Sequence, residues 1–248
     1  MTQRVALVTG GGRGIGREAA LLLAQAGHRV MITARSEQEL AAVGVDFVAA
    51  DLGHPDGCAH AISETENRLG PIDLLVVNHG IGSAHERLIW EQGRDVWEET
   101  MRVNLDGPYE LTRLVVGGMV DRKFGSLVYT SSTAGQIAER AGSAYTTSKH
   151  GLLGLMRAVA QDAGPFGVRA NAVLPGWVRT AMAERSARAE ADERGITADQ
   201  VWSERAAGYP ENRVLTPREV ADVIAFLCSD ASSGINGEAI TVALGGIW

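Results

Sequence analysis

The stretch VALVTGGGRGIG occupies residues 5–16 and decides the fold of this chain. Its first four residues form an apolar run that is typical of a buried strand. Residues 17–26 have the pattern of a helix that ends before Gly27. The glycines therefore lie at a strand-to-helix turn, where the missing Cβ atoms let the backbone approach a pyrophosphate and the helix N-terminus favours its charge. The alternative is a tight glycine turn that binds no ligand.

The rest of the chain alternates between strands and helices. Strands are expected at residues 29–33, 46–50, 72–77, 126–129, 169–173 and 239–242. Helices are expected at about residues 36–43, 55–69, 95–104, 108–122, 144–163 and from 216 onward. This alternation predicts an α/β fold, a doubly wound parallel sheet of the Rossmann type with helices on both faces.

The chain of 248 residues fits one dinucleotide-binding and catalytic domain, 1–248, because no linker rich in Ser, Pro or Gly divides it. Within it, residues 177–213 are a long mixed segment that predicts a mobile lid of two short helices. A break is expected at Gly195, and a capping box begins at Thr197. The charged run 184–194 is most simply a solvated helix face.

Composition excludes several classes of function. The net charge is −7 and the basic residues are scattered, which argues against a nucleic-acid partner. No stretch is long and apolar enough for a membrane span, and no signal peptide precedes the first strand, so a cytoplasmic protein is expected. Cys58 and Cys228 are too few for a metal site or a disulfide framework and are expected to be buried.

Tyr145 and Lys149 are the residues that suggest chemistry. Their spacing of four places both side chains on one face of a helix, one turn apart. An ammonium group beside a phenol favours the phenolate, which suits the phenol to pass a proton to or from a substrate oxygen. Taken alone, the pair is a common feature of solvated helix faces, so the interpretation depends on other motifs.

Those motifs occur together and in order. They are T-G-x-x-x-G-I-G at 9–16, Asn-His-Gly at 78–80, Val-Asn-Leu at 103–105, Ser-Ser at 131–132, Tyr-x-x-x-Lys at 145–149 and Asn-Ala-Val-Leu-Pro-Gly at 171–176. Together they resemble the short-chain dehydrogenase/reductase family, from about residue 4 to the C-terminus. The family implies a nicotinamide cofactor and hydride transfer between an alcohol and a carbonyl group.

The resemblance assigns four catalytic residues. Tyr145 would be the general acid for ketone reduction, and Ser132 would hydrogen-bond the same substrate oxygen. Lys149 would favour the phenolate and hold the cofactor ribose, and Asn104 would hold a water that links Lys149 to solvent. Strand alternation should turn the neighbouring Ser131 away from the site.

NADP(H) is the expected cofactor. Family members that use NAD usually carry an acidic residue at the end of the second strand, where this chain has Ala34. Arg35 follows, and Arg13 lies in the glycine turn; basic residues at these two positions face the 2′-phosphate in relatives that use NADP. If both arginines are bystanders, the protein is instead an NAD-dependent secondary alcohol dehydrogenase.

Other positions match the cofactor site of the family. Asp51 resembles the acceptor of the adenine amino group, and Thr180 resembles a threonine that contacts the nicotinamide carboxamide. His79 replaces the usual alanine, either with local repacking or as an extra polar contact, and receives no catalytic role. The remaining expected cofactor-binding residues are Gly10, Gly14, Ile15, Gly16, Leu52, Asn78, Gly80, Pro175, Gly176 and Val178, with Tyr145 and Lys149.

The sequence therefore favours an NADPH-dependent reductase of a small ketone or a 3-oxoacyl group. A non-catalytic nucleotide-binding protein and an isomerase or dehydratase on the same fold are the other interpretations. By position alone, the neighbours of the substrate carbonyl would be Ser83, Ala84, Thr133, Ile137 and Gly142, and Trp177 is either a pocket wall or a packing residue.

The resemblance also implies a homotetramer or homodimer, with the helices at 108–122 and 144–163 packed against their copies. The expected apolar surplus on these helices consists of Val115, Val116, Met119, Leu152, Leu155 and Met156. The C-terminal Ile247 and Trp248 are expected at a contact between subunits.

Overall fold

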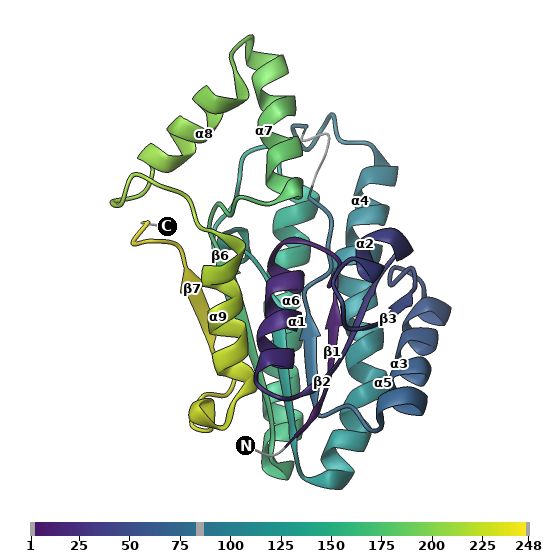
Figure 1. Cartoon of the computed structure of the whole chain (residues 1–248). Coiled ribbons are helices and arrows are strands. Elements are labelled where there is room, and N and C mark those ends of the chain that lie inside the picture. Colours follow the sequence, from purple (N-terminus) through teal and green to yellow (C-terminus); the bar gives the residue numbers. More distant parts are fainter. Residues whose placement is uncertain (1–2, 83–86, 247–248) are drawn as a thin grey trace.

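The computed structural model describes residues 3–82 and 87–246. Its centre is a seven-stranded sheet in the order β3-β2-β1-β4-β5-β6-β7, and every pair of neighbours is parallel (Figure 1). The predicted doubly wound sheet is confirmed. The strands are β1 Val5–Thr9, β2 Arg29–Ala34, β3 Asp46–Ala49, β4 Leu74–Val77, β5 Gly125–Thr130, β6 Val168–Pro175 and β7 Ala239–Val242.

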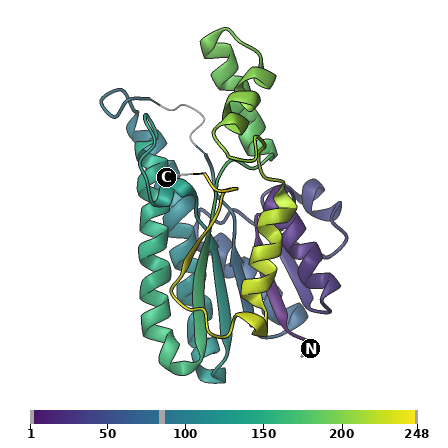
Figure 2. The same ribbon diagram turned by 90° about the vertical axis from the view of Figure 1, so that its left-hand side faces the viewer.

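Helices cover both faces of the sheet, so that the molecule has three layers (Figure 2). Leu7, Leu75 and Leu127 point to the face covered by α3, α5 and α6, whereas Val8, Val76 and Val128 point to the face covered by α1 and α9. The helices are α1 Gly14–Gln25, α2 Glu37–Ala41, α3 Pro55–Leu69, α4 Arg94–Met101, α5 Gly107–Arg122, α6 Ser143–Ala163, α7 Ala181–Arg194, α8 Ala198–Ala207 and α9 Pro217–Cys228.

Two helix boundaries differ from the sequence prediction. Helix α1 begins at Gly14, three residues early, because Gly14 and Gly16 form its first turn. Helices α4 and α5 are not separate but are joined by a π-helical turn over Arg102–Asp106. In this turn the Gly107 N–H donates to Arg102 O, five residues back. Pro108 has no N–H, so regular helical bonding cannot continue across it.

Helices α7 and α8 are the two helices predicted within residues 177–213, the segment called the lid here, and they project beyond the carboxyl ends of the strands (Figure 1). Gly195 ends α7 with φ +65, and the capping box of Thr197 and Gln200 is present. The lid has a small core of its own, with Trp202 packed on three alanines of α7 and Trp177 against it. Trp177 is therefore a packing residue. Glu184, within the charged run, accepts a bond of 2.9 Å from Trp202 Nε1, so the run is only partly solvated.

The expected surplus of apolar surface on α5 and α6 is largely wrong. Val115, Met119, Leu152 and Met156 are all buried in the chain's own core. Val116 and Leu155 remain partly buried, and the large exposed apolar side chains of α5 are Tyr109 and Leu114. Cys58 and Cys228 are buried free thiols, as expected. Across residues 3–82 and 87–246, no helix could cross a membrane.

Candidate active site

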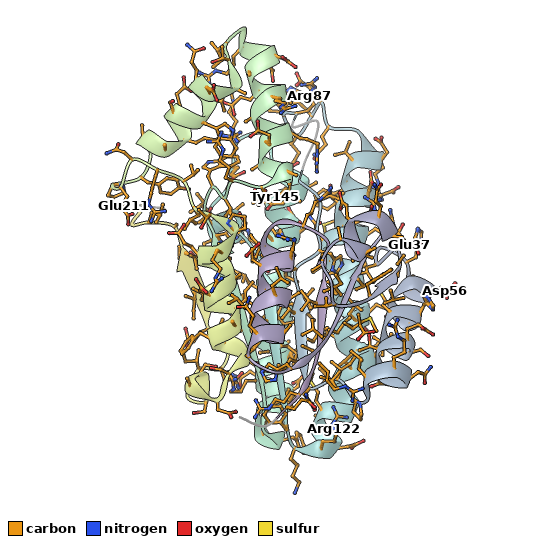
Figure 3. The ribbon with its side chains drawn as sticks, viewed as in Figure 1. Glu37, Asp56, Arg87, Arg122, Tyr145 and Glu211 are labelled. Carbon is orange, nitrogen blue, oxygen red and sulfur yellow. The ribbon has the colours of Figure 1, made fainter. Side chains whose placement is uncertain are left out.

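The carboxyl ends of β1, β4, β5 and β6 meet at one edge of the sheet, below the lid. Tyr145 lies at this edge, while Arg122 lies at the opposite end of the molecule (Figure 3). Strand order reverses between β1 and β4, since the chain leaves β1 for β2 and β3 before returning to β4. A parallel sheet binds ligands in the crevice at such a switch point.

The glycine turn after β1 has the geometry of a pyrophosphate cradle. Gly10 and Gly14 have φ of +65 and +55, which disfavour a side chain. A Cβ on Gly16 would collide with Gly10 O, so this glycine lets the turn close on itself. The first N–H groups of α1, which begins at Gly14, have no partner within the helix and point out of its N-terminus.

Asn78 and Thr9 hold this turn to the end of β4. The Asn78 side-chain amide donates to Thr9 O at 3.2 Å and reaches Gly10 O at 3.5 Å. Thr9 Oγ1 accepts from the Asn78 N–H at 2.9 Å. The side chain of Asn78 therefore shapes the cradle rather than reaching away from it.

The expected catalytic residues converge between β5 and α6. Lys149 is buried; its Nζ donates to Thr130 O at 3.0 Å and lies 5.5 Å from the centre of the Tyr145 ring. Burial lowers the pKa of Lys149 to about 8. The hydroxyl of Ser132 accepts from the Ala134 N–H at 3.2 Å and retains its proton for a further bond. Ser131 instead donates to Lys149 O, confirming that it turns away.

Asn104 reaches the same place from the π-helical turn. Its side chain accepts from Ile81 N at 2.8 Å and donates to Ile81 O at 2.9 Å and to Ser148 Oγ at 3.2 Å. Gly80 lies between Asn104 and Lys149: a Cβ there would be 3.2 Å from Asn104 Oδ1 and 3.6 Å from Lys149 Nζ. The side-chain amide of Asn104 is thus occupied in fixing the loop after β4.

The expected adenosine side of the site carries charged residues. Arg35 is exposed, and Arg13 forms an ion pair of 2.8 Å with Glu39 on α2. Asp51 accepts from the Gly53 N–H at 3.0 Å, and Leu52 is buried, so only its main chain can face a ligand.

Arg102 lies beside Asp51, a position that the sequence did not predict. Arg102 Nη1 lies 4.0 Å from Asp51 Oδ1 and, among the described residues, is buried without a hydrogen-bond partner. Arg102 precedes Asn104 by two residues, but only the π-helical turn brings it beside Asp51.

The chain after β6 closes the site from the lid side. Gly176 is a glycine because a Cβ would collide with the hydroxyl of Tyr209, which accepts from Trp177 N at 2.6 Å. The Val178 side chain is buried in the core, so its main chain alone can face a ligand. Thr180 caps α7 and accepts from Ala183 N, and its methyl group would lie 3.4 Å from a Cβ on Gly14. Thr180, at the start of the lid, therefore lies next to the glycine turn.

The expected neighbours of the carbonyl are only partly described. Ser83 and Ala84 lie outside the described residues. Thr133 and Gly142 are buried, and Ile137 is half-buried. Glu139, which the sequence analysis did not identify, lies in the same loop; burial raises the pKa of its carboxyl group, and the charge of Arg205 opposes this shift. A lone glutamate in a loop carries no sequence signal that its pKa will be raised.

His79 follows the end of β4; the residue is half-buried, and its Nε2 atom is buried. Its Nδ1 lies 2.8 Å from Thr9 Oγ1. Burial lowers the pKa of His79 to about 3, and the charge of Lys149 acts in the same direction. The ring is therefore neutral at working pH and replaces the small alanine usual in the family by packing into the interior.

These residues fit a nicotinamide dinucleotide. The glycine turn and α1 N-terminus suit its pyrophosphate, Asp51 and Leu52 its adenine, and Lys149 a ribose hydroxyl. Within the described parts of the chain, no cluster of three or more His, Cys, Asp or Glu could hold a metal.

Known proteins are similar to this chain over nearly its whole length. A family profile described as enoyl-(acyl carrier protein) reductase matches residues 10–246. Among curated proteins, acetoacetyl-CoA reductase of Shinella zoogloeoides is 34% identical, with 96% of each chain covered. The 3-oxoacyl-(acyl-carrier-protein) reductase of Aquifex aeolicus is 32% identical over 96% of this chain and 95% of its own.

Solved structures of related proteins have the same fold. Levodione reductase superimposes with a TM-score of 0.93 at 29% identity, covering 98% of this chain and 96% of its own. Actinorhodin polyketide ketoreductase, solved with NADPH, has a TM-score of 0.91 at 31% identity and covers 99% and 98%. The glycine turn, the π-turn asparagine and the Ser-Tyr-Lys group, together with these matches over nearly the whole length, make this chain a member of the short-chain dehydrogenase/reductase family, oxidoreductases that act on keto and hydroxyl groups.

Proposed function

We propose that this protein is an NADPH-dependent reductase that converts a small ketone or a 3-oxoacyl group to a secondary alcohol. The observation that carries the proposal is the buried Lys149 ammonium group beside Tyr145, with the Ser132 hydroxyl on the adjacent β5 end. The relatives named as ketone, 3-oxoacyl and acetoacetyl-CoA reductases support this substrate class.

In the proposed reaction, the reduced nicotinamide, when bound, supplies hydride to the carbonyl carbon. The Ser132 hydroxyl donates a hydrogen bond to the carbonyl oxygen and holds the oxygen in place, while keeping its proton. Tyr145 donates its phenolic proton to the same oxygen as negative charge develops there. Lys149 stabilises the phenolate that remains, because its ammonium group is held near the ring in an environment of low dielectric constant.

Asn104 would resupply the proton through a water held by its main chain. Both side-chain amide hydrogens of Asn104 are already donated, to Ile81 O and Ser148 Oγ. Its main-chain carbonyl would pair with the N–H four residues on, but that residue is Pro108, which has none. This carbonyl is therefore the group that suits a water leading to Lys149.

NADPH rather than NADH is proposed because the 2′-phosphate would meet Arg35 and Arg13 and no acidic residue follows β2 directly. The 2′-phosphate would displace Glu39 from Arg13, since a phosphate carries more charge than a carboxylate. An NAD-dependent alcohol dehydrogenase is the alternative, in which Arg13 remains paired with Glu39.

A paired titration of NADPH and NADH tests the cofactor. We expect NADPH to bind at least about tenfold more tightly, with the preference lost in Arg35→Ala and Arg13→Ala, because each charge-assisted contact contributes about 1.5–3 kcal/mol. Arg94→Ala, which removes an exposed arginine of α4 paired with Glu98, is the matched control for lost charge. Tighter binding of NADH would reverse the assignment, and binding of neither would exclude the enzyme.

Tyr145→Phe tests the acid. We expect turnover of ethyl acetoacetate, a small 3-oxo ester, to fall by at least about a hundredfold while the Kd for NADPH stays within about threefold, because only the proton donor is lost. Tyr109→Phe, on the exposed face of α5, is the matched control. Retention of most activity by Tyr145→Phe would show that the acid is another group.

A homotetramer or homodimer and a cytoplasmic location complete the proposal. Exposed Tyr109 and Leu114 on α5 support association. The cytoplasmic location fits an enzyme that draws on a pool of reduced nicotinamide.

A further inference from the structure

His79 contacts three elements of the site, although the reaction proposed above does not use it. Its ring lies between the end of β1, the loop after β3 and the π-helical turn, and its Nε2 atom is buried. A Cβ on Gly107 would lie 3.1 Å from His79 Nε2 and would collide with Leu52 O, so Gly107 makes room for the ring. A buried ring nitrogen is expected to have a hydrogen-bond partner.

The hydrogen bonds of Thr9 Oγ1 determine which nitrogen of the His79 ring carries the proton. Thr9 Oγ1 already accepts from the main-chain N–H groups of Asn78, at 2.9 Å, and His79, at 3.1 Å. A hydroxyl oxygen has two lone pairs, so it cannot accept a third bond from His79 Nδ1. At 2.8 Å the hydroxyl must therefore donate to Nδ1, and its other acceptor, Val76 O, is farther away at 3.2 Å. The neutral ring then carries its proton on Nε2.

That Nε2–H faces a carbonyl that lacks a helical donor. In an α-helix Val103 O would accept from Gly107 N–H, but this group donates to Arg102 O. The donor five residues on would be Pro108, which has no N–H. The Val103 carbonyl is the main-chain group that faces the His79 ring. As the atoms stand, Nε2 is buried and has no partner within hydrogen-bond geometry among the described residues.

We propose that His79 is a positioning residue: its Nε2–H serves the Val103 carbonyl and so fixes the π-helical turn that presents Asn104 to Lys149. Pairing removes two unsatisfied buried groups at once. The Val103 carbonyl belongs to the peptide unit of the Asn104 nitrogen, so holding it sets the orientation of Asn104. The inference rests on the proposed reductase, because Asn104 is there the proton supply of Lys149.

Three substitutions of His79 test this role. Glutamine carries a donor about as far as Nε2, whereas asparagine reaches only about as far as Nδ1 and leucine carries none. We expect kcat for ethyl acetoacetate to fall about ten- to a hundredfold in His79→Asn and His79→Leu, because small misplacements of a catalytic group have effects of this size. His79→Gln should retain most of kcat. The Kd for NADPH should stay within about threefold in all three, and the solvent deuterium isotope effect on kcat should rise in the first two.

Cys58→Ala is the matched control, since it alters another buried side chain next to the same turn, whose thiol donates to Leu52 O and Gly107 O. Hydrogen exchange of residues 102–107 in the cofactor-free protein gives a readout independent of activity. We expect faster exchange there in His79→Asn than in Cys58→Ala or His79→Gln. Unchanged kcat and exchange in His79→Asn, or equal losses in the asparagine and glutamine variants, would overturn the inference. A wild-type protein that binds neither nucleotide and reduces no ketone would instead overturn the proposed function, and the exchange comparison would still test the role of His79.

Discussion

At the residue scale, Lys149 shows how the proposed chemistry of the site lowers the stability of the fold. Its aliphatic stem packs in the interior, and its ammonium group has one main-chain partner, Thr130 O. Burial lowers the pKa of Lys149 from 10.5 to about 8 because the charged form is poorly solvated. The same burial strengthens its effect on Tyr145. A residue that serves catalysis in this way destabilises the fold that carries it.

Lys149→Met should therefore be inactive and more stable. The pKa change from 10.5 to about 8 corresponds to about 3 kcal/mol, and the lost bond to Thr130 offsets about 1 kcal/mol. We expect the variant to be about 2 kcal/mol more stable than wild type to urea at pH 7, without cofactor. Below pH 8 the lysine is charged in the folded and unfolded states, so wild type is less stable than the variant by the full amount. Between pH 8 and 10.5 the unfolded chain binds more protons, so wild-type stability rises and the difference shrinks. A variant less stable at pH 7 would contradict this account.

At the element scale, the lid is a helical hairpin with its own packing. Arg205, on α8, is buried and connects the hairpin: it donates to Ala183 O at 3.3 Å and Ser186 Oγ at 3.1 Å and pairs with Glu190 at 2.9 Å. Its guanidinium group also lies 3.6 Å from the centre of the Trp177 ring. One side chain thus joins α7, α8 and the chain that leaves β6.

Arg205→Met should loosen the lid and leave the sheet intact. We expect proteolysis within residues 181–207 to accelerate by about tenfold or more, because the variant loses the bonds of Arg205 to Ala183 O, Ser186 Oγ and Glu190, which join α8 to α7. KM for the ketone should rise more than the Kd for NADPH. Arg188→Met, which removes an exposed arginine of α7 paired with Glu184 at 3.5 Å, is the control. Equal proteolysis of the two variants would show that Arg205 does not hold the lid.

At the scale of the whole molecule, the outer faces of α5 and α6 carry exposed glycines. Gly117 and Gly154 lie in mid-helix, and a Cβ on either would meet nothing within 4 Å in this chain. Glycine there costs about 1 kcal/mol relative to alanine. Close approach of helices from another copy explains both positions better than any contact within the chain.

Gly154→Arg should disrupt this association. We expect wild type to sediment as a tetramer or a dimer and the variant as a smaller species, with an unchanged circular dichroism spectrum, because the new side chain has open space in the monomer. Gly234→Arg adds the same side chain at another open site, outside the helices, and is the control. A monomeric wild type would contradict the proposed assembly.

Local pattern alone determined much of this protein. The apolar run 5–8, the glycine turn and the two capping boxes at Thr197 and Thr216 specify strands, a turn and helix starts through residues only a few positions apart. The four-residue spacing of Tyr145 and Lys149 likewise needs only a helix.

The tertiary structure decided the features that depend on distant residues. The bonds of Asn104 to Ile81 and Ser148, the pairing of Arg13 with Glu39, the place of Arg102 beside Asp51 and the contact of His79 with Thr9 each join segments far apart in the chain. Periodicity reports which face of an element is buried but not what packs against it. Desolvation, and with it the low pKa of Lys149, arises only when the strands and helices assemble around a group.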